Sequence, residues 1–233
     1  MTTGIDAAQL YRLMAWLSPA FPTGGFSYSH GLEYAVEAEL VKGRAGAEAW
    51  IAGVLRFGAG RSDAQLFALA YRAAGAGDET ALKEIAGLAS ALRGTAELAL
   101  ESRAQGEAFL KSVERAWPQI SLSRWSALLQ EADIAPSLPV AVALATKAHG
   151  IALAPALAAF TQGFAATLVS AAVRLIPLGQ SEGLAILAAL EPAVDEAVSS
   201  ALAATPDRLG AAAPMVDWCS MRHETQYTRL FRS

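Results

Sequence analysis

The residues best suited to chemistry are concentrated near the start of the chain, in the segment Trp16–Glu33, which reads WLSPAFPTGGFSYSHGLE. Its adjacent glycines, Gly24 and Gly25, could lie against a phosphate. A P-loop, however, needs GxxxxGK followed by Ser or Thr, and the sequence has neither that pattern nor GxGxxG. The run Gly25–Ser29 approaches the GxSxG turn of serine hydrolases, but it lacks the second glycine and a preceding strand. Phosphate binding and serine hydrolysis are therefore disfavoured.

Metal ligation is the second chemistry to consider, and the chain has only three histidines, His30, His149 and His223. No HExxH or CxxC pattern accompanies them. Cys219 and His223 are the weak metal candidates, because a helix would align them and sulfur with imidazole suits nickel, copper or zinc. A durable site usually needs three or four ligands, so the sequence favours a buried cysteine and a hydrogen-bonded histidine.

Two pairs of carboxylates stand one helical turn apart: Glu33 with Glu37, and Glu97 with Glu101. Either pair could flank a substrate as acid and base. The alternative is that these side chains are solvated or ion-paired. Since charges of both signs recur at four-residue spacing between positions 95 and 115, the sequence favours a charged helix face there.

Composition limits the class of protein. The 233 residues suffice for one large domain, and the net charge of −4 with a pI near 5.4 disfavours a nucleic-acid partner. A single cysteine and an N-terminus without a secretory pattern favour the cytoplasm.

The longest uncharged run, Ala148–Val173, would be long enough to span a bilayer. Pro155 interrupts it, and weakly apolar alanine and several polar residues dilute it. We therefore expect no membrane span, but a buried core helix or a dimer-interface helix.

The elements that must position these residues are predicted to be helices, because apolar residues recur at three- and four-residue spacings and strand alternation is not evident. The fold class expected is all-α, a single-domain bundle of about ten helices. Start signals are a capping box at Ser62–Gln65, an N-cap at Asp78 and Pro192 in a first turn. Gly43 and the Gly-Ala-Gly runs at 58–60 and 75–77 suggest helix ends. The predicted helices cover residues 6–17, 26–40, 45–58, 62–74, 79–92, 95–115, 122–131, 138–150, 155–174, 181–190 and 192–204.

The end of the chain is predicted to be separable from the bundle. A loop-like composition at Thr205–Pro214 divides an all-helical domain, residues 1–214, from a C-terminal tail, residues 215–233. The tail mixes arginines with aromatic residues, a composition typical of interfaces. Either it is a frayed terminus, or it is a mobile tail that orders on a partner.

Three segments together resemble the UreF family of urease accessory proteins: SPAFPTGGFSYSHGLE at 18–33, RLIPLGQSEG at 174–183 and SMRHETQYTRLFRS at 220–233. Two intermediate stretches, ELALESRAQGEAFL at 97–110 and SLPVAVALATKAHGI at 137–151, agree in order and character. The resemblance therefore runs almost from end to end.

The resemblance implies an all-α, dimer-forming protein without a catalytic centre or cofactor. Its partners would be UreD (also called UreH), the GTPase UreG and apo-urease. UreF would bridge UreD and UreG and assist GTP-dependent nickel insertion. Two family proposals for its action stay open: it modulates the GTPase, or it gates fidelity by delaying GTP hydrolysis until the urease site is correctly loaded.

The resemblance also implies partner-binding residues. Tyr28 and Arg229 are the leading pair, expected to approach one another when the tail orders on the partner. Arg174 stands where the family often has lysine, near a nickel-transfer path or an interface. The other positions carried over are Phe26, Glu33, His223, Glu224 and Arg232.

Two rival functions stay open. One is an autonomous nickel carrier that uses Cys219 and His223. The other is a small helical enzyme that uses His30 or the Glu33/Glu37 pair.

Overall fold

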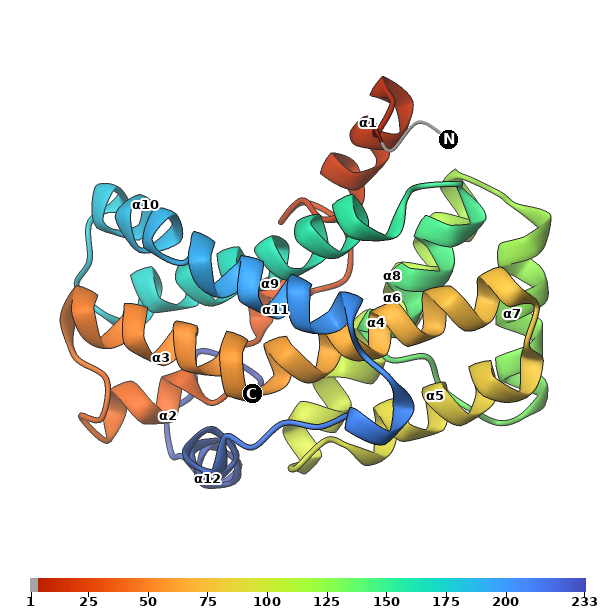
Figure 1. The fold of residues 1–233 in the computed structure, drawn as a ribbon. Coiled ribbons are helices and arrows are strands. Elements are labelled where there is room, and N and C mark those ends of the chain that lie inside the picture. The colour runs from red at the N-terminus through yellow and green to blue at the C-terminus, as the bar shows by residue number, and fades with distance from the viewer. Residues whose placement is uncertain (1–3) are drawn as a thin grey trace.

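The computed structural model describes residues 4–233, and every regular element within that range is helical (Figure 1). The twelve α-helices are α1 (Ala7–Trp16), α2 (Leu32–Glu37), α3 (Gly43–Phe57), α4 (Ala59–Ala76), α5 (Glu79–Ala91), α6 (Ala96–Ala116), α7 (Ile120–Glu131), α8 (Leu138–Ala148), α9 (Leu153–Leu175), α10 (Gln180–Ala189), α11 (Glu191–Leu202) and α12 (Pro214–His223). Two short 3-10 turns, η1 (Gly25–Ser27) and η2 (Pro206–Arg208), complete them. The predicted all-α, single-domain class is confirmed.

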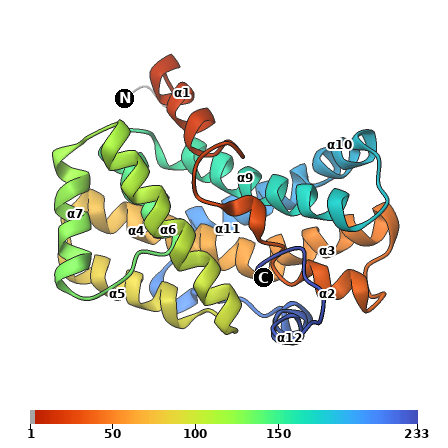
Figure 2. The same ribbon diagram turned by 180° about the vertical axis from the view of Figure 1, so that it is seen from behind.

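Two apolar clusters form the core. The larger surrounds α4 and α8 and draws side chains from α5, α6 and α7; the smaller lies among α2, α3, α10 and α12. Helices α9 and α11 contribute to both clusters and so join them (Figures 1 and 2). In α8, residues 139–146 are all buried, because neighbouring helices cover it on every side.

Close packing around α8 depends on one small residue of α6. A Cβ atom added at Gly106 would lie 2.2 Å from the carbonyl oxygen of Pro136, just before α8 begins. Only glycine lets the two backbones approach this closely. The position thus fixes α6 against the start of α8.

Several predicted helix boundaries are confirmed. Asp78 caps α5, with its carboxylate accepting the amide of Ala81 at 2.9 Å, and Pro192 lies in the first turn of α11. Gly77 ends α4 in the left-handed conformation.

Other predicted boundaries are wrong. The capping box at Ser62–Gln65 does not form: α4 begins at Ala59, after Gly58, and Ser62 and Gln65 are buried inside the helix. Gly43 begins α3 and does not end a helix. The helix predicted over 26–40 is broken, because His30 and Gly31 adopt positive φ angles of 56° and 77°.

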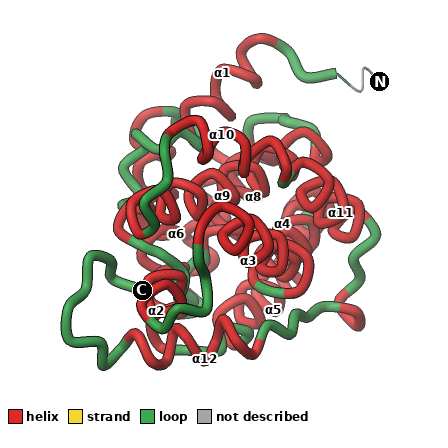
Figure 3. The backbone as a smooth tube through the Cα atoms, turned by 90° about the vertical axis from the view of Figure 1, so that its left-hand side faces the viewer, coloured by secondary structure: helices red, strands yellow, loops and turns green. Residues whose placement is uncertain are grey.

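The sequence does not predict α12, because it predicts a loop over Thr205–Pro214 followed directly by a tail. The loop exists, and Arg72 holds its start by donating from Nη1 to the carbonyl of Ala204 at 2.9 Å. The polar loop is followed by α12, which lies across the end of the bundle beside α2 (Figure 3).

Helix α9 contains most of the uncharged run. It is long and apolar enough to cross a membrane, with a mean hydropathy of 1.6 in its most apolar window, but half of that window is buried within the protein. Core helices of soluble proteins pass the same test, so the finding is weak evidence for a membrane.

Candidate functional site: the groove that holds the C-terminal tail

The N-terminal turn of α2 supplies the central acceptor of the site. Glu33 is 6% exposed, and its carboxylate accepts the backbone amides of Leu230 at 2.6 Å and Phe231 at 2.9 Å. The same carboxylate lies 2.9 Å from Nε2 of His223. A carboxylate with several N–H donors is a strong anchor for an irregular backbone.

His223, in the last turn of α12, lies between two carboxylates. Its Nε2 faces Glu33, and its Nδ1 lies 2.7 Å from Oε2 of Glu97 in α6. Which of the two ring nitrogens donates depends on the tautomer. Arg229 joins the same group, because its Nη1 donates to Oε1 of Glu97 at 2.8 Å.

A second anchor holds the last residue. Ser29 donates its amide to the carbonyl of Ser233 at 2.8 Å, and its hydroxyl donates to the same oxygen. The hydroxyl of Ser233 donates to Glu101 at 2.7 Å. Burial raises the pKa of the Glu101 carboxyl, but His30, the Ser233 hydroxyl and Arg93 together outweigh it and hold that pKa below its usual value.

The apolar anchor of the tail is Phe231, which is 4% exposed. The guanidinium of Arg174 lies 4.3 Å from the centre of its ring, and Nη1 of Arg174 donates to the carbonyl of Phe26 at 2.8 Å. Burial lowers the pKa of Arg174. One arginine therefore fastens both the loop before α2 and the tail.

Among the residues implied by the resemblance, Glu33, Arg174, His223 and Arg229 come together around the tail. The backbone of Arg232 joins them by donating to the carbonyl of Ser27 at 2.7 Å, while its side chain is exposed. Glu224 is exposed at the end of α12.

The structure does not bring the leading pair, Tyr28 and Arg229, together. Tyr28 is 4% exposed and lines a cavity, and no hydrogen bond or ring contact between Tyr28 and Arg229 occurs within residues 4–233. Phe26 is 66% exposed beside Arg174. The arginine–aromatic contacts near the tail instead join Arg174 to Phe231 and Arg222 to Tyr34.

Sequence reasoning missed four members of this groove: Glu97, Glu101, Ser29 and Phe231. The sequence places Glu97 and Glu101 one helical turn apart, but the charges that recur around them predict a solvated helix face. The outer face of α6 is indeed charged and exposed at Arg103, Glu107 and Lys111. What distinguishes Glu97 and Glu101 is their place beside Leu98 and Ser102 on the inner face of the helix, which neighbouring helices cover.

The weak metal candidates are poorly suited to ligation in this arrangement. Burial raises the pKa of the Cys219 thiol to about 11, so the thiolate that binds metals is scarce at neutral pH. Both nitrogens of His223 face carboxylates. Within residues 4–233, no cluster of three or more His, Cys, Asp or Glu side chains is arranged to hold a metal ion.

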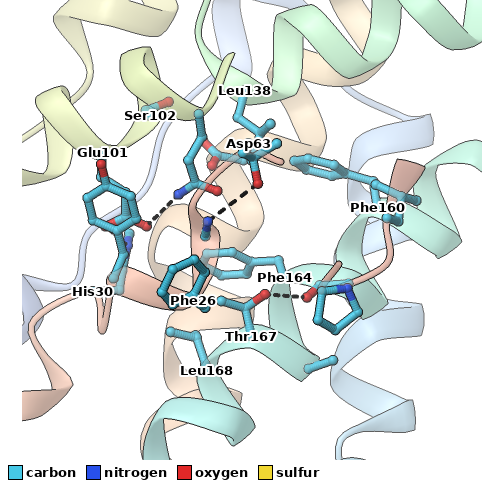
Figure 4. A pocket seen from close by; sticks show the side chains of 18 of the residues that line it. Phe26, His30, Asp63, Glu101, Ser102, Leu138, Phe160, Phe164, Thr167 and Leu168 are labelled. Carbon is cyan, nitrogen blue, oxygen red and sulfur yellow. Dashed lines mark hydrogen bonds and ion pairs between the residues drawn. The ribbon is translucent and has the colours of Figure 1, made fainter. Parts of the chain in front are cut away.

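A cavity lies on the other side of the loop that follows α1 (Figure 4). Its walls are mainly apolar and come from α1, α6, α8 and α9, and one end holds the buried Asp63–Arg93 ion pair with Glu101 and Ser102. His30 lines it, whereas Glu33 and Glu37 do not. Glu37 instead accepts the side-chain amide of Gln226, so both members of that carboxylate pair bind the tail.

The fold and the groove thus define a class: an all-helical protein in which the carboxylates of Glu33, Glu97 and Glu101 bind the protein's own C-terminal tail. Comparison with known proteins is specific. The family model described as UreF matches residues 41–191.

Curated relatives extend the match over nearly the whole chain. A "Urease accessory protein UreF" of Magnetococcus marinus is 48% identical over 230 residues, covering 97% of this chain and 98% of the relative. Proteins of the same name from Rhodopseudomonas palustris (strain BisB5) and Bradyrhizobium diazoefficiens are 49% and 47% identical, each over 98% of this chain and 93% of the relative. The chain belongs to the UreF family.

Proposed function

We propose that this chain is a urease accessory protein without a catalytic centre of its own, which bridges UreD (UreH) and UreG in the cytoplasm and assists GTP-dependent nickel insertion into apo-urease. The observation that carries the proposal is the construction of the tail. Hydrogen bonds, ion pairs and the buried ring of Phe231 fix it on the bundle, whereas Trp218 and Tyr227 are left on the outside.

The exposed face of the tail has the composition of a protein-binding surface. Met215, Trp218 and Met221 of α12 are 51%, 42% and 50% exposed, and Tyr227 is fully exposed. Arg222 lies over the Tyr34 ring, with its guanidinium carbon 5.8 Å from the ring centre. Tryptophan, tyrosine, methionine and arginine dominate binding energy at interfaces. This face is the proposed binding surface for UreD and UreG.

The resemblance assigns recruitment of UreG to Tyr28 and Arg229, and the geometry makes Arg229 the better test. Tyr28 is buried, so its truncation would also remove core contacts, whereas Arg229 is partly exposed and acts through Glu97. Arg229→Ala should weaken co-purification with UreG in the presence of UreD while leaving the helical content unchanged. Arg103→Ala, an exposed arginine of α6, is the matched control.

The deciding experiment co-expresses the chain with UreD, UreG and apo-urease and measures both complex formation and nickel-dependent urease activity. Full recruitment and activation by Arg229→Ala would contradict the role given to the tail. Stoichiometric nickel binding by the isolated chain would favour the carrier, and turnover of a substrate by the isolated chain would favour an enzyme. Because UreG recruitment and GTP hydrolysis are measured separately, the same system distinguishes GTPase modulation from fidelity gating.

A homodimer is part of the proposal. Ala158, Gln162 and Ser170 lie on the half of α9 that the bundle leaves uncovered, in a stretch without formal charge. A second copy is a suitable cover because such a face lacks the charges that favour solvent. Ala158→Glu should shift the sedimentation of the purified chain toward the monomer, and unchanged sedimentation would remove α9 from the interface.

A further inference from the structure

The loop Gly24–Gly31 separates the cavity from the tail. Phe26, Tyr28 and His30 line the cavity. Between them, the backbone carbonyl of Ser27 accepts the amide of Arg232, and the amide and hydroxyl of Ser29 donate to the carbonyl of Ser233. The loop is therefore a wall with one face toward each site.

The cavity, of about 240 Å³, has one polar end (Figure 4). Its apolar lining includes Phe109, Phe160 and Phe164. At the polar end, Nδ1 of His30 and the hydroxyl of Ser102 are buried without hydrogen-bond partners among residues 4–233, and the nearest carboxylate oxygen, on Glu101, lies 3.5 Å from the His30 nitrogen. Buried polar groups of this kind normally find a partner. The cavity thus has an apolar body and unused hydrogen-bonding capacity at one end.

The charges that line the cavity balance. Asp63 pairs with Arg93 at 2.6 Å, and Glu101 at the inner end is offset by Arg174 at the mouth. The formal charges of these four side chains sum to zero, so their sum favours neither an anion nor a cation. The lining therefore suits a small uncharged molecule that is mainly apolar and carries one hydroxyl or N–H group.

Two residues connect the cavity to the tail directly. Glu101 accepts the hydroxyl of Ser233 on one side and faces His30 on the other. Arg174 lines the cavity, holds the carbonyl of Phe26 and lies over the ring of Phe231. The loop also packs closely on α12, because a Cβ at Gly31 would lie 3.1 Å from the backbone nitrogen of Ser220. A change in tail position must alter the wall of the cavity.

We infer that the cavity is a binding site for a small, uncharged, mainly apolar ligand with one hydrogen-bonding group, and that its occupancy favours the docked tail. The wall has its present shape only while the tail holds Ser27, Ser29 and Arg174. By linkage, a ligand that fills this shape stabilises the docked tail, and tail docking strengthens ligand binding by the same factor. The regulatory meaning rests on the proposed function of the tail, but both effects belong to the isolated chain.

The test uses the full-length chain and 4-fluorophenol, whose ring and hydroxyl match the lining. Its affinity is measured by fluorine NMR, and tail docking by hydrogen exchange of the Leu230 and Phe231 amides. We expect saturable binding and, at saturation, exchange at these amides slowed by about fivefold, a typical size for coupling between two sites.

Phe231→Ala removes the apolar anchor and should weaken the affinity for 4-fluorophenol by about the same factor, about fivefold. Leu230→Ala, a neighbour that is 65% exposed, is the matched control and should leave the affinity unchanged. Absence of binding at millimolar 4-fluorophenol would overturn the site. Binding without any change in exchange, or with equal affinity in Phe231→Ala, would overturn the coupling. None of these measurements involves UreG, so their failure is distinct from failure of the proposed function.

Discussion

Two regions of the molecule, the core around α8 and the groove that holds the tail, are stabilised by different kinds of contact. Around α8, nearly every contact is apolar, and residues 139–146 are buried. In the tail groove, Glu33, Glu97 and Glu101 accept charge-assisted hydrogen bonds from a segment without regular structure. Apolar burial is lost only when the fold is lost, whereas an ionic groove can exchange its occupant for water or for another protein. The contrast separates an apolar scaffold from a polar groove.

The largest effect should come from breaking the scaffold. Leu144 of α8 is fully buried, so Leu144→Ala should lower the free energy of unfolding by about 3 kcal/mol, through lost transfer energy and a cavity. Urea denaturation measures this. Hydrogen exchange of the tail amides at low denaturant should not change; selective release of the tail by Leu144→Ala would show that the two regions are not separable.

Breaking the groove should have a smaller and more local effect. In Glu33→Gln, the amides of Leu230 and Phe231, which now donate to the two oxygens of a carboxylate, would have a single uncharged amide oxygen as acceptor. A hydrogen bond to a charged group contributes about 2 kcal/mol. Exchange of the Leu230 and Phe231 amides should accelerate by about thirtyfold, the equivalent of that energy.

The control for this substitution is Glu107→Gln, on the exposed face of α6. Equal exchange in the two variants would argue that apolar contacts, and not Glu33, hold the tail.

Acidification should act on the scaffold through His149. Its ring packs on Trp16 with centroids 5.0 Å apart, and burial, reinforced by Arg12, lowers its pKa from the ordinary value of 6.5. Below pH 6.5 the His149 side chain is therefore protonated more readily in the unfolded chain than in the folded chain. The contribution of neutral His149 to the free energy of unfolding is fully present above pH 6.5 and is lost as the pH falls below it.

His149→Gln should flatten the pH dependence of urea denaturation just below pH 6.5. An unchanged slope would assign the dependence to other groups.

The smallest effect should follow substitution of Cys219, which sharpens the contrast by removing the carrier hypothesis. Cys219→Ala deletes one buried sulfur, costs about 1 kcal/mol, and should leave nickel-dependent urease activation at the wild-type level. Loss of activation with an intact fold would return Cys219 to the metal route.

Prediction from sequence succeeded where local signals agree with tertiary structure. The helices around Asp78 and Pro192 carry their start signals in the residues themselves. The prediction failed at Ser62, where a capping pattern lies inside a longer helix because burial against α11 overrides it.

The same distinction applies to the site. A resemblance could mark Glu33, Arg174, His223 and Arg229, because the motifs contain them. It could not show that Glu97 and Glu101 complete the groove, since that requires knowing which face of α6 meets the tail. Spacing in the sequence also does not reveal that the guanidinium of Arg174 lies over the ring of Phe231.

The loop after α11 sets how strongly the tail competes for its own groove. Arg72 fixes its start and α12 its end, so residues 205–213 can extend only about 30 Å from the bundle. A short tether keeps a released segment at an effective concentration of the order of millimolar. Any free peptide that imitates the tail must exceed that concentration to displace it, whereas a partner that grips the exposed face of α12 can carry the whole segment away without competing at all.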